Sequence, residues 1–306
     1  MEVFNVEVIA IRPRGYCYGV VNALNVVKKA KKDHPNEKVH ILGIIIHNKF
    51  VKEALDRMGV ISVYESGLSR MQLLETIEDG VVIFSAHGIA QDVVDRAIEK
   101  GLTVYNATCR DVIKTQDIVK DYLAENYKVL YIGKENHPEA EAMLSIDKDN
   151  IKLISNLDDL DNLEIDDKTI VTNQTTMSIY DTKEVMDKIV KINPRVIIVN
   201  EICKATQIRQ EALLNLDDYD LVYVVGDHLS NNTNNLKKIA SRSVNKVRLV
   251  ESVMDIDDRD LKDINKVGVT AGASTPTYLT QQVITYLEKF PNVDKSDRVI
   301  DYSKII

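Results

Sequence analysis

The chain has 306 residues, of which 44% are hydrophobic and 28% charged, so it resembles a globular protein with room for two or three small domains rather than a disordered one. Its formal net charge of −8 gives no indication of a nucleic-acid or anionic-membrane partner. No apolar run approaches the roughly 20 residues that span a bilayer, and the N-terminus lacks the pattern of a signal peptide, so we expect a cytoplasmic protein.

Residues 1–106 form the first of three predicted repeats. In this repeat, short apolar strands lead into polar loops, and a helical pattern follows each loop. The polar residues directly after these strands include Cys17, His47 and His87. Strands that alternate with helices predict parallel βαβ packing, in which the loops that follow the strands gather at one edge of the sheet.

Residues 107–199 and 200–290 repeat this order. The second repeat carries Cys109, His137-Pro138-Glu139 and Gln174-Thr175, and the third carries Cys203, Ser230-Asn231-Asn232 and Ser274. The cysteines lie 92 and 94 residues apart, and the other loops recur at similar offsets, which argues against coincidence. The sequence therefore predicts an α/β fold of three pseudo-symmetric lobes with parallel-rich sheets around a central cavity. Residues 291–306 are expected to form a loosely packed C-terminal tail.

The three cysteines contain no C-x-x-C pair, and each precedes a predicted helix. A helix N-terminus lowers the pKa of a thiol and stabilises a thiolate ligand. Three thiolates that converge without a fourth would leave one iron of a cubane cluster open to a substrate oxygen. Two other interpretations remain: cysteines packed as small apolar residues, and zinc held by three cysteines and a histidine.

The remaining loop residues favour an anion beside this site. Imidazoles, hydroxyls, amides and helix-end N–H groups suit a phosphate or diphosphate where no motif supplies Arg or Lys. The residues of this kind are His47, His87, His137, Thr175, Ser230, Asn232 and Ser274. Glu139 is predicted to be the only carboxylate in the core of these loops. Burial would raise its pKa and make it a proton donor, although a glutamate after Pro138 also suits a helix start.

Nine phrases in order carry a resemblance to a known family. They are RGYCYGVVNA, IIHNKFV, FSAHG, NATC, HPEAEA, TNQTTMS, EICKATQIRQEA, SNNTNNL and TAGASTP, within residues 10–285. Together they resemble the IspH/LytB family of 4-hydroxy-3-methylbut-2-enyl diphosphate reductases. The resemblance implies one [4Fe–4S] cluster on Cys17, Cys109 and Cys203 with one open iron. It also implies two-electron reductive dehydroxylation of an allylic diphosphate to isopentenyl and dimethylallyl diphosphates, the last step of the methylerythritol phosphate pathway.

The resemblance also implies roles for the loop residues and an external electron donor, ferredoxin or flavodoxin. Glu139 would supply protons, with Gln174 and Thr175 completing the hydroxyl network. The diphosphate would lie among His47, His87, His137, Ser230, Asn231, Asn232 and Ser274. Asn106, Arg110 and Asn231 depart from the family pattern. The alternative from a different functional class is a non-catalytic iron–sulfur sensor or cluster carrier, and a zinc hydrolase is a third hypothesis.

Overall fold

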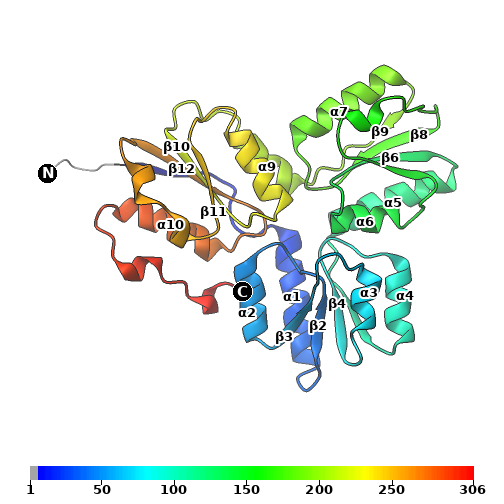
Figure 1. Cartoon of the computed structure of the whole chain (residues 1–306), viewed down its shortest axis with the longest axis horizontal. Coiled ribbons are helices and arrows are strands. Elements are labelled where there is room, and N and C mark those ends of the chain that lie inside the picture. The colour runs from blue at the N-terminus through cyan, green and yellow to red at the C-terminus, as the bar shows by residue number, and fades with distance from the viewer. Residues whose placement is uncertain (1–5) are drawn as a thin grey trace. The chain divides into compact units, whose positions relative to one another are not determined.

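The computed structural model describes residues 6–306, which contain ten α-helices and three parallel sheets of four strands each (Figure 1). These residues separate into two compact units. Unit A comprises residues 6–20, 47–58 and 204–306, and unit B comprises residues 21–46 and 59–203. The predicted α/β class with parallel sheets is therefore confirmed.

Unit A contains one sheet in the order β1-β12-β10-β11. Its strands are β1 (Glu7–Ala10), β10 (Leu221–Val225), β11 (Val247–Val250) and β12 (Lys266–Ala271). Its helices are α2 (Lys49–Arg57), α8 (Lys204–Glu211), α9 (Asn231–Ala240) and α10 (Thr277–Lys289), with short 3-10 turns at Val253–Asp255, Asp258–Leu261, Lys295–Arg298 and Tyr302–Lys304. The helix α1 (Tyr18–Asp33) begins in unit A and continues into unit B.

Unit B contains two sheets, in the orders β3-β2-β4-β5 and β7-β6-β8-β9. The strands of the first are β2 (Val39–Leu42), β3 (Val60–Val63), β4 (Val81–Phe84) and β5 (Thr103–Asn106). Those of the second are β6 (Lys128–Ile132), β7 (Ile151–Ile154), β8 (Thr169–Asn173) and β9 (Ile197–Ile198). The helices are α3 (Arg70–Glu75), α4 (Gln91–Glu99), α5 (Arg110–Ala124), α6 (Pro138–Leu144) and α7 (Ile179–Ile192), with a 3-10 turn at Asp158–Leu160.

The three sheets have the same topology. In each, the strand that precedes a cysteine is an edge strand with one parallel neighbour: β1 pairs with β12, β5 with β4, and β9 with β8. The strand β1, grouped by sequence with residues 1–106, thus completes the sheet of residues 221–271. The lobe boundaries at 106, 199 and 290 stay predictions, and residues 1–5 lie outside the described part of the chain.

Apolar, β-branched runs form the strands because both faces of a parallel sheet are covered by helices. In the sheet of β6 and β8, alternate residues face opposite layers (Figure 1). Val129 and Tyr131 pack with α5 and α6, whereas Leu130 and Ile132 pack with α7. Successive residues of these strands therefore belong to the cores on opposite faces of the sheet.

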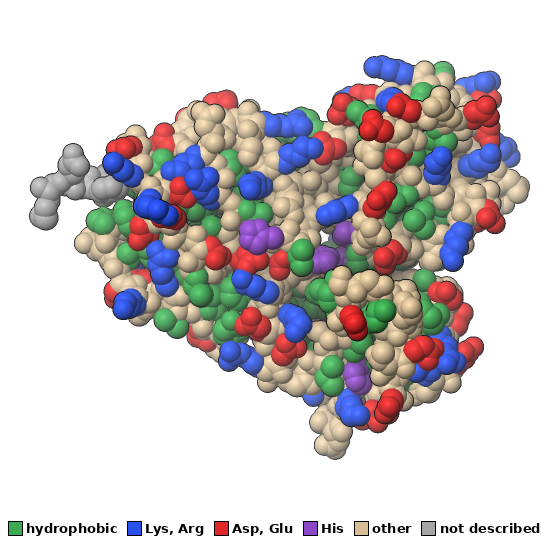
Figure 2. Space-filling model, in the orientation of Figure 1, with side chains coloured by type: hydrophobic (Ala, Val, Ile, Leu, Met, Phe, Trp, Pro, Cys, Tyr) green, Lys and Arg blue, Asp and Glu red, His purple; other side chains and the backbone are tan. Residues whose placement is uncertain are grey.

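Acidic and basic side chains are interspersed on the visible face (Figure 2). Between residues 6 and 306, no helix combines the length and the apolar composition that crossing a membrane requires.

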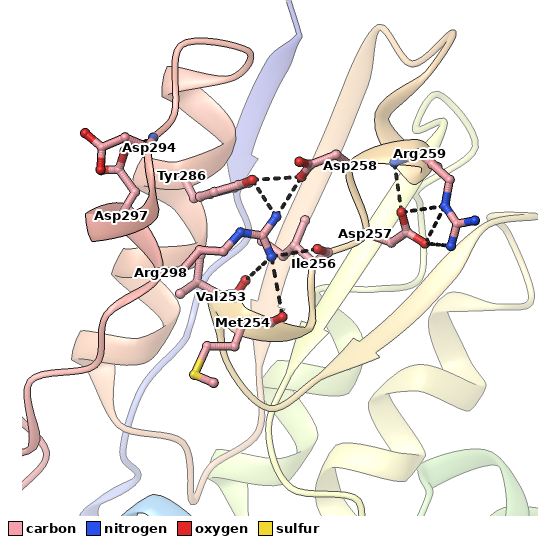
Figure 3. A network of polar contacts seen from close by, with 10 residues as sticks. All are labelled: Val253, Met254, Ile256, Asp257, Asp258, Arg259, Tyr286, Asp294, Asp297 and Arg298. Atoms are coloured by element: carbon pink, nitrogen blue, oxygen red, sulfur yellow. Dashed lines mark hydrogen bonds and ion pairs between the residues drawn. The ribbon is translucent and has the colours of Figure 1, made fainter.

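The C-terminal segment is held more firmly than predicted (Figure 3). Arg298 donates to the carbonyl of Ile256 at 2.9 Å, to a carboxylate oxygen of Asp258 at 2.8 Å and to the hydroxyl of Tyr286 at 2.6 Å. Ile305 is 1% exposed, and its carbonyl accepts a bond from the Tyr16 hydroxyl at 2.7 Å. The expectation that residues 291–306 pack loosely was wrong. It rested on the charged composition of this segment, which does not show that Arg298 donates to several backbone carbonyls at once.

Candidate functional site

Each cysteine lies at the same junction between a strand and a helix. Cys109 is the N-cap of α5, and Cys17 and Cys203 directly precede α1 and α8. Each cysteine N–H donates to a carbonyl in the loop after the neighbouring strand, which is β12, β4 or β8. These pairs, each 3.0 Å apart, are Cys17 to Ala273, Cys109 to Ala86, and Cys203 to Thr175. The predicted equivalence of the three cysteines is therefore seen in their local hydrogen bonding.

The donor chemistry of these cysteines fits a soft metal or cluster. Among residues 6–306, all three cysteines are half-buried and none is in a disulfide. The thiolate is the form of cysteine that ligates soft metals. Partial burial lets a cluster be shielded from water while one side stays accessible.

Two of the cysteine-bearing segments are tied together inside unit B. Lys114, in the second turn of α5, donates to both carboxylate oxygens of Glu201 at 3.0 and 2.9 Å. The Glu201 N–H donates to the side-chain oxygen of the buried Asn173 at 3.0 Å. The ion pair thus connects the helix that follows Cys109 with the segment that leads into Cys203.

Glu139, the second residue of α6, is 2% exposed. One carboxylate oxygen, Oε1, accepts from the Thr175 N–H at 2.7 Å, and the other, Oε2, accepts from the Thr175 hydroxyl at 2.9 Å. Burial raises the pKa of Glu139 to about 7, with a smaller upward contribution from the charge of Asp111, while the Thr175 and Tyr131 donors act in the opposite direction. A carboxyl with this pKa carries a proton for much of the time near neutral pH and can deliver it.

Thr175 connects this carboxyl with a cysteine. Its carbonyl accepts from the Cys203 N–H at 3.0 Å, while its own N–H and hydroxyl hold Glu139. Thr175 is 4% exposed and follows β8 directly after Gln174. A single residue therefore fixes the distance between the carboxyl and the segment that carries Cys203.

His137 caps α6 through its Nδ1, which accepts from the Glu139 N–H at 3.2 Å. Its ring meets that of His87 edge to face, with the ring centroids 5.5 Å apart. Gln174 is fully buried and accepts from the Lys134 N–H at 3.0 Å. The structure thus brings His87, His137 and Glu139 together in unit B. The Gln174 side chain connects the loop after β8 with the loop after β6.

His47 and Ser274, both in unit A, are also brought together. The Ser274 hydroxyl donates to the His47 carbonyl at 3.1 Å. Asp227 is 7% exposed, and its two carboxylate oxygens accept from the N–H groups of Lys49 and Leu229 at 3.0 and 2.7 Å. The prediction that Glu139 is the only carboxylate in these loop cores is therefore wrong.

Ser230 is the N-cap of α9 and accepts from the Thr233 N–H at 3.3 Å. Asn231 and Asn232 follow it in the first turn. Asn232 is 4% exposed, and neither its amide nitrogen nor its amide oxygen has a hydrogen-bond partner in residues 6–306. A Cβ at Gly272 would lie 2.2 Å from the Thr233 hydroxyl oxygen, so only glycine allows this helix start to approach the end of β12 so closely. A buried orphan amide next to a helix N-terminus fits a polar, anionic ligand.

Two residues of these sites were missed by sequence reasoning. Tyr131 lies in an apolar strand and has no local signal that distinguishes it from core, yet its hydroxyl donates to Oε1 of Glu139 at 3.4 Å. Asp227 had a usable signal, because it directly follows Gly226 at the end of β10, where the other repeats place loop residues.

Comparisons with known proteins agree with these features. The LytB protein family matches residues 8–288. A protein of Geobacillus sp. (strain WCH70), named 4-hydroxy-3-methylbut-2-enyl diphosphate reductase, is 44% identical over 308 residues, covering 98% of this chain and 97% of that protein. The solved E-1-hydroxy-2-methyl-but-2-enyl-4-diphosphate reductase of Plasmodium falciparum is similar with a TM-score of 0.87 and 29% identity, over 97% of this chain and 91% of that one. A second solved structure, of the (E)-4-hydroxy-3-methyl-but-2-enyl diphosphate reductase described as the terminal enzyme of the non-mevalonate pathway, is similar with a TM-score of 0.65 and 28% identity, over 92% and 98% of the two chains.

Proposed function

This chain belongs to the LytB protein family, and we propose that it reduces (E)-4-hydroxy-3-methylbut-2-enyl diphosphate to isopentenyl diphosphate and dimethylallyl diphosphate. In this reaction two electrons and two protons enter, the allylic C–O bond breaks, and the hydroxyl leaves as water. The observation that carries the proposal is the buried Glu139, held by Thr175 with a pKa of about 7, because the reaction consumes protons and such a carboxyl can deliver one near neutral pH. This is the last step of the non-mevalonate pathway, in which one similar solved enzyme is described as terminal.

The proposed cofactor is one [4Fe–4S] cluster with three cysteine ligands and one open iron. Cys17, Cys109 and Cys203 would hold it, and their shared junction and equal hydrogen bonds support this assignment. When bound, such a cluster supplies low-potential electrons and a Lewis-acidic iron. Cys203→Ser should remove the cluster, measured as loss of iron, of acid-labile sulfide and of the broad visible absorption of an anaerobic preparation. A stoichiometric zinc content without sulfide would contradict the assignment.

Glu139 and Thr175 are the proposed catalytic residues. The protonated Glu139 would release its proton through Oε2 to the Thr175 hydroxyl, which lies 2.9 Å away and can accept and donate at once. The Thr175 hydroxyl would in turn orient the hydroxyl of the substrate. Because Glu139 is 2% exposed, the proton reaches substrate without exchange through bulk water.

The diphosphate is proposed to bind imidazole, hydroxyl and amide side chains rather than Lys or Arg side chains. These residues are His47, His87, His137, Gln174, Thr175, Ser230, Asn231, Asn232 and Ser274. The orphan amide of Asn232 and the N-terminus of α9 support the assignment in unit A. Local donors of this kind can hold an anion within a chain whose net charge is −8.

The electrons are proposed to come from an external carrier, ferredoxin or flavodoxin. A cytoplasmic location is proposed with it, since thiols that ligate a cluster need a reducing compartment.

The decisive experiment is anaerobic reconstitution followed by turnover of the hydroxymethylbutenyl diphosphate with a low-potential reductant. We expect both products to appear, together with binding of the substrate to the holoenzyme. An intact cluster that neither binds nor reduces this substrate would overturn the proposal and favour a sensor or cluster carrier.

A further inference from the structure

Tyr131 is a buried tyrosine that neither the sequence motifs nor the proposed mechanism uses. It lies in β6, is 0% exposed, and packs among apolar residues of α5 and α6 such as Val119 and Met143. Its hydroxyl donates to Oε1 of Glu139 at 3.4 Å. An aromatic side chain of this volume would fill the core equally well as phenylalanine, so the hydroxyl is the part that packing does not require.

The hydrogen bonds on Glu139 are unequal between its two oxygens. Oε1 faces two donors, the Thr175 N–H at 2.7 Å and the Tyr131 hydroxyl at 3.4 Å. Oε2 accepts from the Thr175 hydroxyl, at 2.9 Å. A backbone N–H can never accept a proton, and a Tyr131 hydroxyl that turned to accept would leave its own proton buried.

From this geometry we infer that Tyr131 is a positioning residue that keeps Oε1 of Glu139 an acceptor and so places the transferable proton on Oε2, opposite the Thr175 hydroxyl. The inference rests on the proposed function, in which Glu139 is the proton donor. It adds a structural reason why the proton leaves in one direction only.

The other charged and titratable groups around Glu139 do not compete for Oε1. Asp111 approaches from α5 and acts on the carboxyl through its charge alone, raising the pKa of Glu139. On α6 itself, Nδ1 of His137 accepts from the Glu139 N–H and so faces the backbone, with the His87 ring beyond it. Tyr131, by contrast, donates a hydrogen bond directly to this carboxylate.

The test is Tyr131→Phe in the holoenzyme, with Tyr223→Phe as the matched control. Tyr223 is a fully buried strand tyrosine of β10 in unit A, and its hydroxyl has no hydrogen-bond partner in residues 6–306. Losing a donor to the ionised carboxylate favours the protonated form. The alkaline limb of the kcat profile should therefore move upward by about half a unit to one unit in Tyr131→Phe, with unchanged iron and sulfide content. Tyr223→Phe should leave the limb in place.

A second measurement does not depend on turnover. The infrared C=O band of protonated Glu139, identified by its absence in Glu139→Gln, should titrate at higher pH in Tyr131→Phe and shift to higher frequency. In the wild-type holoenzyme the band should already lie at the low frequency of a carbonyl that accepts hydrogen bonds. An unmoved band and an unmoved alkaline limb in Tyr131→Phe, with the cluster intact, would overturn the inference. Absence of turnover in the wild type would instead overturn the proposed function and leave the infrared test valid.

Discussion

Two buried polar sites, that of Glu139 and Gln174 in unit B and that of Asn232 in unit A, differ in how their hydrogen-bonding groups are satisfied. In unit B, both oxygens of Glu139 have donors, and Gln174 is bonded at its oxygen and at its nitrogen. In unit A, the equally buried Asn232 has no protein partner for either end of its amide in residues 6–306. A satisfied network is preorganised for chemistry, whereas an orphan amide gains its hydrogen bonds from a ligand. The comparison therefore sets the proposed proton donor, Glu139, against one of the proposed diphosphate ligands, Asn232.

Glu139→Gln tests the chemical side of this comparison and should have the largest effect. The glutamine keeps an acceptor for the Thr175 N–H but carries no acidic proton, so we expect kcat to fall by roughly 100-fold or more while substrate affinity stays near wild type. Single-turnover kinetics and equilibrium binding measure the two quantities. The control is Glu141→Gln, an exposed glutamate of the same helix. Near-wild-type turnover in Glu139→Gln would mean that another group delivers protons.

The same carboxyl predicts a pH dependence of stability. The pKa of Glu139 is raised from 4.5 to about 7 in the folded protein, so its stabilising effect is complete below pH 4.5 and is lost as the pH rises through 7. The loss amounts to roughly 3 kcal/mol. The free energy of unfolding of Glu139→Gln, relative to that of the wild type, should therefore rise between pH 4.5 and 7 and stay constant above pH 7. Anaerobic denaturation of the wild-type and Glu139→Gln holoenzymes across this pH range measures the difference. If the free energies of unfolding of both proteins changed in parallel with pH, the raised pKa of Glu139 would be contradicted.

Asn232→Leu tests the binding side. Replacing an unsatisfied buried amide by an apolar group of similar size should raise the free energy of unfolding by about 1 kcal/mol, while loss of donors to the ligand should weaken substrate binding about tenfold. The pH profile should stay unchanged because Glu139 is untouched. Thr182→Val, at another buried hydroxyl without a partner in residues 6–306, should stabilise without affecting binding. Lower stability of Asn232→Leu would show that the amide is satisfied within the fold.

What the sequence predicted follows from local pattern. Strand, cysteine and helix recur with regular spacing, so the junctions of Cys17, Cys109 and Cys203 and the position of Glu139 at a helix start could be read directly. The bond from Tyr131 to Glu139 could not be predicted, because a tyrosine in an apolar strand has the same pattern whether its hydroxyl meets a partner or not. Contacts between segments far apart in the sequence could not be predicted either.

Two such contacts were out of reach. The pairing of β1 with β12 joins residues more than 250 positions apart, and no local signal selects that partner among three similar sheets. The carbonyls that Arg298 binds lie 42 to 45 positions before it in the sequence. Both contacts depend on which segments meet, and the local sequence pattern shows only which elements the segments form.

The smallest predicted effect concerns Lys114, whose pair with Glu201 adds a charged contact to the satisfied network of unit B. The Lys114 side chain is 63% exposed and that of Glu201 is 11% exposed, so the pair contributes at most about 1 kcal/mol. Lys114→Gln loosens the connection between the segments that carry Cys109 and Cys203, and the cluster should be lost up to about fivefold faster to a chelator under anaerobic conditions. Lys120→Gln is the control, because Lys120 meets only Asp117 of its own helix, at 3.9 Å, among the ion pairs of residues 6–306. Equal rates of cluster loss in both variants would mean that the hydrogen bonds of Asn173 and Thr175 hold the Cys203 segment without the ion pair.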